Sequence, residues 1–129
     1  MHPTMRRATS DDRRFVLSSW LASFWSTWAR RHVDRDTYYR HYPEQVRLYM
    51  DKAQVHVAFF EEVPDEILGW ACVEGDVCHY VYVKSIYRKK GIARGLLPSE
   101  TRWYSSPTDT LGGLVMKKCG LKFNPWRKE

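Results

Sequence analysis

The chain has 129 residues and a formal net charge of +6, and 15% of its residues are aromatic. Its length predicts one domain over residues 1–129, which buries about two-thirds of the surface that the unfolded chain exposes. The three cysteines form no Cys-x-x-Cys pair, which argues against a disulfide framework or a zinc site and favours a reducing, cytoplasmic setting, while the positive charge indicates an anionic ligand or partner.

The first elements predicted are a short edge strand, Met5–Ala8, and a helix that follows an N-cap at Thr9 or Ser10. Apolar residues recur along this helix at intervals of three and four, which places one set on one face: Leu17, Trp20, Leu21, Phe24 and Trp28. The serines of the helix are expected to lie largely outside this apolar face. They also interrupt its apolar run too often for a bilayer span, so we expect no membrane segment.

A second helical region, extending to about Lys52, is predicted to begin at a cap at Asp34 or Asp36 and to be interrupted by Pro43. The residue before a proline is biased away from the helical conformation. Two outcomes therefore remain open. Either the helix breaks near Tyr42, or a fresh helix begins with Pro43 in its first turn.

Three strands rich in β-branched and aromatic residues are predicted next, over Val55–Phe60, Ile67–Val73 and Val77–Lys84. Short turns separate them, which indicates an antiparallel meander. Gly69 marks a bulge or a close backbone approach inside the second of these strands. Beyond a short helix over 92–97, the pattern predicts a strand at 101–106, a helix at 109–118 and an edge strand at 121–126.

The turn between the third of these strands and the short helix reads Arg88-Lys89-Lys90-Gly91-Ile92-Ala93. A turn of small residues that opens a helix directs unpaired backbone N–H groups toward one point, and the helix dipole adds partial positive charge there. Such a turn binds phosphate.

These residues resemble the central motif of the GNAT superfamily of acetyl-CoA-dependent N-acetyltransferases, Arg/Gln-x-x-Gly-x-Gly/Ala after a strand that ends in valine. The matching residues are Arg88, Gly91, Ala93 and Val83. The order of the predicted elements is also that of the GNAT fold. This is a mixed α/β domain whose central, mostly antiparallel sheet is flanked by helices, with the phosphate-binding loop between strand 4 and helix 3. The aromatic first helix is similar to that of small members found in bacteriophages.

The resemblance implies acetyl-CoA as co-substrate, with its pyrophosphate on the 88–93 turn and its pantetheine on the exposed backbone of Val81 and Val83. The residues it implies for cofactor binding are Val81, Tyr82, Val83, Arg88, Lys89, Lys90, Gly91, Ile92, Ala93 and Arg94. No spacing of residues suggests a metal.

Deprotonation of the acceptor amine calls for a base. Strand alternation predicts that His79 shares a face with Val81 and Val83. Serotonin N-acetyltransferase and its relatives place a histidine at the corresponding point, so the resemblance implies His79 as the base. A histidine side chain in general, with an unperturbed pKa of about 6.5, can accept a proton at pH 7. A buried, purely structural histidine is the other interpretation, and Glu74 is the alternative carboxylate base.

The last predicted helix departs from the family pattern Asn-x-x-Ala-x-x-x-Tyr-x-x-x-Gly. The corresponding residues here are Asp109, Gly112, Met116 and Gly120. The family's tyrosine protonates the leaving thiolate, and Met116 cannot donate a proton. Tyr104 and Cys119 are the candidate substitutes.

Three functions remain open at this point. The first is an N-acetyltransferase that moves an acetyl group from acetyl-CoA to an amine of a small molecule, a protein lysine or a protein N-terminus. The second is a catalytically degenerate domain that binds an acyl-CoA or a protein partner, as Met116 suggests. The third and least favoured is a basic nucleic-acid-binding module, in which the aromatic residues would stack on bases.

Overall fold

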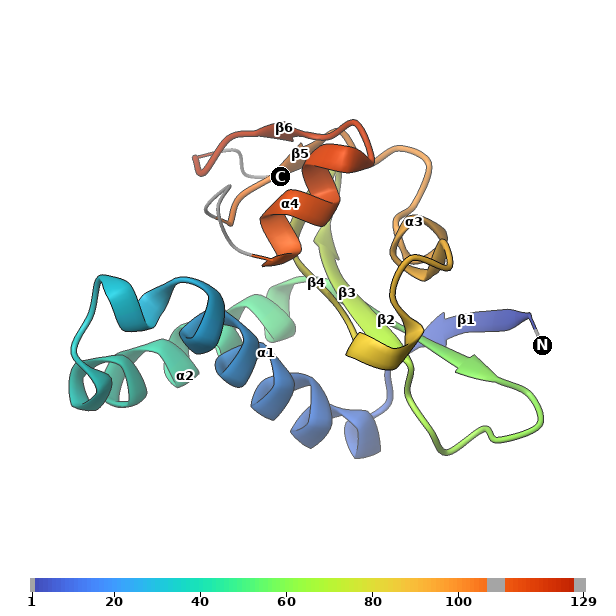
Figure 1. Cartoon of the computed structure of the whole chain (residues 1–129), viewed down its shortest axis with the longest axis horizontal. Helices are drawn as coiled ribbons and strands as arrows, with labels where there is room; N and C mark the ends of the chain where they lie inside the picture. Colours follow the sequence, from blue (N-terminus) through green and yellow to red (C-terminus); the bar gives the residue numbers. More distant parts are fainter. Residues whose placement is uncertain (1, 107–110, 127–129) are drawn as a thin grey trace.

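The computed structural model describes residues 2–106 and 111–126. Its strands form one sheet in the order of the chain (Figure 1). Antiparallel pairing joins the first four, β1 (Pro3–Arg7), β2 (Gln54–Phe60), β3 (Gly69–Glu74) and β4 (Val77–Val83). Two short strands, β5 (Trp103–Tyr104) and β6 (Lys122–Phe123), extend the sheet in parallel.

The α-helices are α1 (Arg13–Thr27), α2 (Arg35–Lys52), α3 (Ile92–Leu96) and α4 (Leu111–Lys118). Single 3₁₀ turns lie at Ser10–Asp12, Ala29–Arg31 and Ser85–Tyr87. The predicted mixed α/β fold, with helices around a mostly antiparallel sheet, is confirmed. The predicted start of the last helix at Asp109 lies outside the described residues. No helix among those described combines the length and apolar character that a membrane crossing requires.

One face of the sheet packs against α1 and α2 through a core of aromatic rings. Trp20 of α1 lies at its centre and is 1% exposed. Its ring centroid is 5.2 Å from that of Trp70, 5.4 Å from that of Tyr80 and 5.8 Å from that of Tyr49. The predicted apolar stripe is confirmed for Trp20 and Phe24, which are buried here.

Two serines of α1 lie inside this aromatic core, contrary to the prediction that the serines would point elsewhere. Ser19 Oγ accepts a hydrogen bond from Trp70 Nε1 at 2.8 Å, and Ser23 Oγ bonds Tyr80 Oη at 2.8 Å. A buried indole N–H or phenol needs a polar partner, because leaving it unsatisfied costs about 1–3 kcal/mol. Ser19 and Ser23 supply such partners to Trp70 and Tyr80.

Pro43 lies inside α2, which continues from Arg35 to Lys52, so both outcomes predicted for this proline are wrong. A proline in a helix interior costs about 3 kcal/mol, because it removes one hydrogen bond and crowds the preceding turn. Buried side chains on both sides offset that cost, since Tyr38 precedes the proline and Val46 and Met50 follow it. At the N-terminus, the Asp34 carboxylate accepts from the Thr37 N–H.

The other face of the sheet packs against α3 and α4 and is built from smaller residues, among them Ala58 and Ala71. The predicted close backbone approach at Gly69 is confirmed, because a Cβ there would lie 2.5 Å from the Tyr82 carbonyl oxygen. Small side chains on this face let α3 lie close to β3 and β4, and they leave room beside β4.

Candidate active site

A bulge in β4 changes which side chains face which helices. Cys72 of β3 pairs with Tyr80 and Val73 pairs with Cys78, so His79 is the extra residue of β4. Cys78 packs in the core under α3 and α4, whereas Tyr80 packs in the aromatic core on the opposite face.

His79 lies on the side of α1 and α2, where its ring stacks on Tyr49 of α2 with centroids 4.5 Å apart. The prediction that it shares a face with Val81 and Val83 is wrong, since those two valines pack on the other face. The reason is the bulge, which interrupts strand alternation between Cys78 and Tyr80.

The outer edge of β4 is open beyond this bulge. β5 pairs with β4 only at Val77 and Cys78, and the Ser105 N–H donates to the Cys78 carbonyl as the two segments part. Lys84 N–H donates to Leu68 O on the β3 side. Because hydrogen bonds alternate along an antiparallel strand, the N–H and C=O groups of Val81 and Val83 point to the open edge.

The turn after β4 has the conformation that its glycine permits. Gly91 has φ of 79° and is the N-cap of α3, and Lys89 has φ of 64°. A Cβ on Gly91 would meet no atom within 4 Å, so the space in front of this residue is open. Arg88 turns back toward the strand and donates from Nε to the Val83 carbonyl at 2.8 Å.

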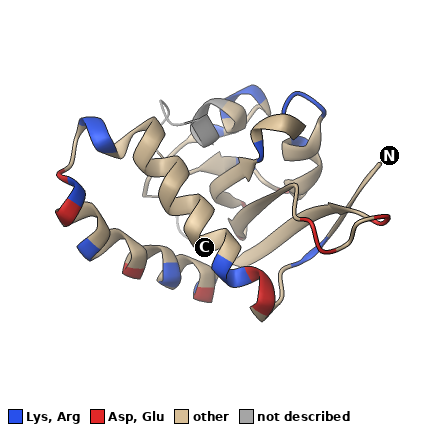
Figure 2. Ribbon diagram, turned by 60° about the horizontal axis from the view of Figure 1, so that its bottom comes forward, with Lys and Arg blue, Asp and Glu red and all other residues tan. Residues whose placement is uncertain are grey.

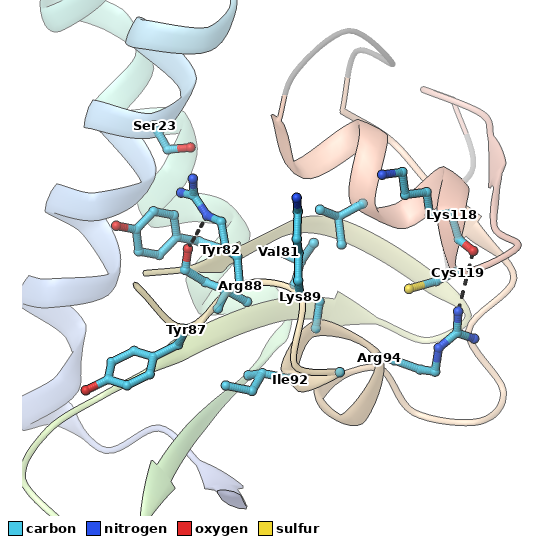
Figure 3. A pocket seen from close by; sticks show the side chains of 14 residues that line it. Ser23, Val81, Tyr82, Tyr87, Arg88, Lys89, Ile92, Arg94, Lys118 and Cys119 are labelled. Atoms are coloured by element: carbon cyan, nitrogen blue, oxygen red, sulfur yellow. Dashed lines mark hydrogen bonds between the residues drawn. The ribbon is translucent and has the colours of Figure 1, made fainter. Parts of the chain in front are cut away.

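The open edge and the turn together line one cavity of about 340 Å³ (Figure 3). It is lined by nine of the ten residues predicted to bind the cofactor, namely Val81, Tyr82, Val83, Arg88, Lys89, Gly91, Ile92, Ala93 and Arg94. The tenth, Lys90, is exposed on the same turn. Five further residues complete the wall, namely Ser23 of α1, Tyr87, and Val115, Lys118 and Cys119 at the end of α4. No motif marked Ser23, Tyr87, Val115 or Lys118 as a site residue, and Cys119 was considered only as a proton donor.

The cavity is basic. Arg88, Lys89, Arg94 and Lys118 line it, and no acidic side chain of the described residues does. Figure 2 shows Lys and Arg at the turn before α3 and at the end of α4, Asp and Glu on the β2–β3 loop, and residues of both charges alternating along α2. Arg94 also donates to the Lys118 carbonyl at 3.5 Å, which links α3 to α4. An anionic ligand is therefore favoured in this cavity.

Ser23 brings α1 to the same cavity. Its hydroxyl is bonded to Tyr80 Oη, and burial raises the pKa of Tyr80. Tyr80 therefore remains a neutral phenol at physiological pH.

His79 and Tyr104, two of the residues predicted for proton transfer, are both buried outside the cavity. His79 is 7% exposed and does not line the cavity; its Nε2 lies 2.8 Å from Glu74 Oε1 and its Nδ1 lies 2.7 Å from Ser105 Oγ. Tyr104 is 2% exposed, its ring lies against Phe123, and it does not line the cavity either; burial raises its pKa.

The end of α4 shows which of the predicted proton donors could meet a ligand. Met116 is fully buried in the core under α4. Cys119 does line the cavity, so of the two candidate substitutes for the family's tyrosine it is the one that the structure brings there.

No protein-family model and no curated protein sequence matches the chain. Solved structures do match its fold. A possible acetyltransferase from Clostridium difficile 630 aligns with a TM-score of 0.59 at 15% identity, over 100% of this chain and 98% of that one. Apo YjaB from Escherichia coli aligns with a TM-score of 0.55 at 21% identity, over 74% of this chain and 62% of that one. The chain thus spans less than two-thirds of the length of YjaB.

A third structure contains a coenzyme A derivative. It is AAC(6')-Iy in complex with the bisubstrate analogue CoA-S-monomethyl-acetylneamine, with a TM-score of 0.50 at 17% identity, over 100% of this chain and 96% of that one. At such identities the likeness establishes architecture. The chain has the fold of the GNAT acetyltransferases.

Proposed function

We propose that this protein transfers an acetyl group from acetyl-CoA to the amine of a small molecule or a protein. The observation that carries the proposal is the cavity itself, in which the open edge of β4 at Val81 and Val83 meets the turn from Arg88 to Ala93. Coenzyme A needs both features, because its pantetheine carries amides and its other end carries phosphates. The match to an enzyme held with a CoA-linked analogue supports the same ligand.

In this arrangement the pyrophosphate takes the N–H groups of the turn and the charges of Lys89 and Arg94. Lys90 and Arg88 lie beside them. The pantetheine amides bond to Val81 and Val83, and the thioester then points away from the turn, toward the place where β4 and β5 part. Binding requires the Arg88 side chain to leave the Val83 carbonyl or to share it.

The reaction is a direct displacement. The amine nitrogen attacks the thioester carbonyl carbon, the N–C bond forms, the C–S bond breaks, and the amine proton passes to a base, for which His79 is our proposal. Coenzyme A leaves as a thiolate. A thiol with a pKa near 8.5 is a tolerable leaving group without full protonation, so the buried Met116 in place of a tyrosine does not forbid turnover.

Two measurements test this function. Acetyl-CoA should raise the melting temperature, and free thiol should be released when acetyl-CoA is mixed with at least one member of a panel of amines, polyamines and lysine-bearing proteins. If acetyl-CoA neither stabilises the protein nor releases thiol with any acceptor, the proposal is wrong.

A second candidate is a domain that binds an acyl-CoA without turnover. It is favoured by the burial of Met116, which leaves no tyrosine from α4 at the cavity among the described residues. Stabilisation by acetyl-CoA without thiol release from any acceptor would select this candidate.

A further inference from the structure

The side chains of Glu74, His79 and Ser105 form a continuous hydrogen-bonded chain at the point where β4 and β5 separate. We propose that Ser105 is the group that receives the proton of the acceptor amine and passes its own to His79, while Glu74 positions the imidazole. The inference rests on the proposed acetyl transfer. It adds to that transfer a catalytic serine that the sequence pattern did not mark.

The directions of the two hydrogen bonds follow from the chemistry of the carboxylate. An ionised Glu74 can only accept, so a neutral His79 must carry its hydrogen on Nε2 and donate it across the 2.8 Å contact. Its Nδ1 is then an acceptor, and Ser105 must be the donor in the 2.7 Å contact. The hydroxyl of Ser105 therefore donates its hydrogen bond to His79 Nδ1. The lone pairs of Ser105 Oγ are left to accept from a substrate.

The surroundings hold His79 in this orientation. Tyr49 stacks on one side of the ring, and Ser106 Oγ donates to the His79 carbonyl. The titratable groups that contact the ring are the Glu74 carboxylate from β3 and the Tyr49 phenol from α2. The Glu74 carboxylate contacts Nε2 directly, and an oxygen that accepts a hydrogen bond there favours Nε2–H.

Ser105 lies where the reacting end of the co-substrate would be. It is the first residue after β5, its N–H makes the last backbone bond to Cys78, and the open edge of β4 begins at Val81. Neither His79 nor Ser105 lines the cavity itself, but His79 is buried whereas Ser105 is only half-buried and is the more accessible of the two. In the proposed relay, the buried imidazole of His79 exchanges protons with the substrate through the more accessible hydroxyl of Ser105.

The step balances without any further reagent. The ammonium form of the acceptor loses one proton to Ser105 Oγ while the hydroxyl proton of Ser105 moves to His79 Nδ1, and His79 becomes an imidazolium paired with Glu74. The free amine nitrogen then bonds to the acetyl carbon, the C–S bond breaks, and the second proton of the nitrogen passes to water. The coenzyme A thiolate leaves. His79 later returns its proton to water.

The test compares Ser105→Ala and His79→Gln with the unchanged protein on one acceptor, across pH from about 7 to 10. A positioned base contributes a factor of about 10² to 10⁴, so both variants should lose about 100-fold or more in kcat near pH 7 with little change in the KM for acetyl-CoA. The loss should shrink as the pH approaches the pKa of the amine, about 10.4 for a lysine-type acceptor, because free amine then forms unaided. Ser99→Ala, a second serine beside a glutamate but on the exposed surface, should change nothing.

Two further results decide the proposal. Ser105→Thr keeps the hydroxyl and should therefore retain most of the activity that Ser105→Ala loses. Glu74→Gln should lower the activity, because a glutamine no longer fixes the hydrogen of His79 on Nε2. Nitrogen NMR of labelled histidine should show Nε2–H for His79, and an Nδ1–H tautomer would overturn the relay whatever the activity. A loss in Ser105→Ala that stays constant with pH would make Ser105 structural. Thiol release unaffected by Ser105→Ala would overturn the relay alone, whereas no release by the unchanged protein would overturn the acetyl transfer itself.

Discussion

The two faces of the sheet carry different kinds of side chain. Toward α1 and α2 the sheet carries Trp70 and Tyr80, which pack against Trp20 in a buried cluster of rings. Toward α3 and α4 it carries alanine and valine, and the cavity lies along its edge. β4 takes part in both, because Tyr80 and Tyr82 face one way and Val81 and Val83 face the other.

This difference separates stability from ligand binding within a small chain. Rings bury the most apolar area per residue, so the aromatic face can hold the sheet in place while the edge beside the thinner face remains open. The bulge at His79 turns this side chain toward α2, where it stacks on Tyr49. Changes on the aromatic face should therefore affect folding, and changes around the cavity should affect binding.

The largest effect is expected at the centre of the aromatic face. Trp20→Ala should reduce the free energy of unfolding by about 3–5 kcal/mol, because it leaves a cavity among Trp70, Tyr80 and Tyr49. Denaturation monitored by circular dichroism measures this. Trp25→Ala, on the half-buried flank of the same helix, is the matched control and should cost less than half as much. Equal losses of unfolding free energy in the two variants would show that the ring cluster around Trp20 contributes no more to stability than the flank of the helix does.

The next effect is expected at the turn. Gly91→Glu should weaken acetyl-CoA binding by at least about 100-fold, or about 2.8 kcal/mol, because it places a carboxylate where the phosphates must approach. Calorimetry on the folded variant measures the affinity. Gly75→Glu is the matched control, since Gly75 also has a positive φ, of 60°, but lies in the β3–β4 turn outside the cavity. Unchanged affinity in a folded Gly91→Glu protein would contradict our placement of the phosphates.

A smaller effect is expected where β1 is tied to the start of α1. Asp12 accepts from Arg6 at 2.7 Å and from the Thr9 N–H at 2.8 Å, and the hydrogen bond from Arg6 lowers its pKa below 3.8 against the opposing effect of burial. Asp12→Asn should cost about 1 kcal/mol at pH 7, a figure reduced by the partial exposure of Arg6.

The pH dependence of that effect has a definite sign. A lowered folded-state pKa stabilises the protein above the unfolded value of 3.8, and the contribution is lost as the pH falls through the folded value. Denaturation curves of the unchanged protein and Asp12→Asn should therefore converge only as the pH falls below 3.8, through the lowered folded-state pKa of Asp12. Asp11→Asn, exposed beside it, should show neither the cost nor the convergence.

The smallest effect is expected from a single exposed cation of the cavity. Lys118→Gln should weaken acetyl-CoA binding by about two- to fivefold at low salt, and the difference should fade as salt is added, because exposed charges are screened. Lys117→Gln lies one residue away outside the cavity and is the control. A loss of affinity that persists at high salt would indicate that Lys118 binds the ligand directly and does not act only through long-range electrostatic attraction.

Much of this architecture could be predicted from local patterns. The alternation of strands, the three- and four-residue spacing around Trp20 and Phe24, and the turn from Arg88 to Ala93 each depend on neighbours in the chain. Nine of the ten predicted cofactor-binding residues line the cavity for the same reason, since strand, turn and helix follow one another directly.

What only the tertiary structure decided depends on segments that are distant in the chain. The extra residue at His79 exists only relative to the pairing partner β3, and Ser105 reaches His79 only because β5 lies beside β4. Helix α2 passes through Pro43 because buried contacts outweigh a local preference. Ser23 enters the cavity wall only when α1 packs across Tyr80, because burial of the phenol requires a polar partner that no local pattern could specify.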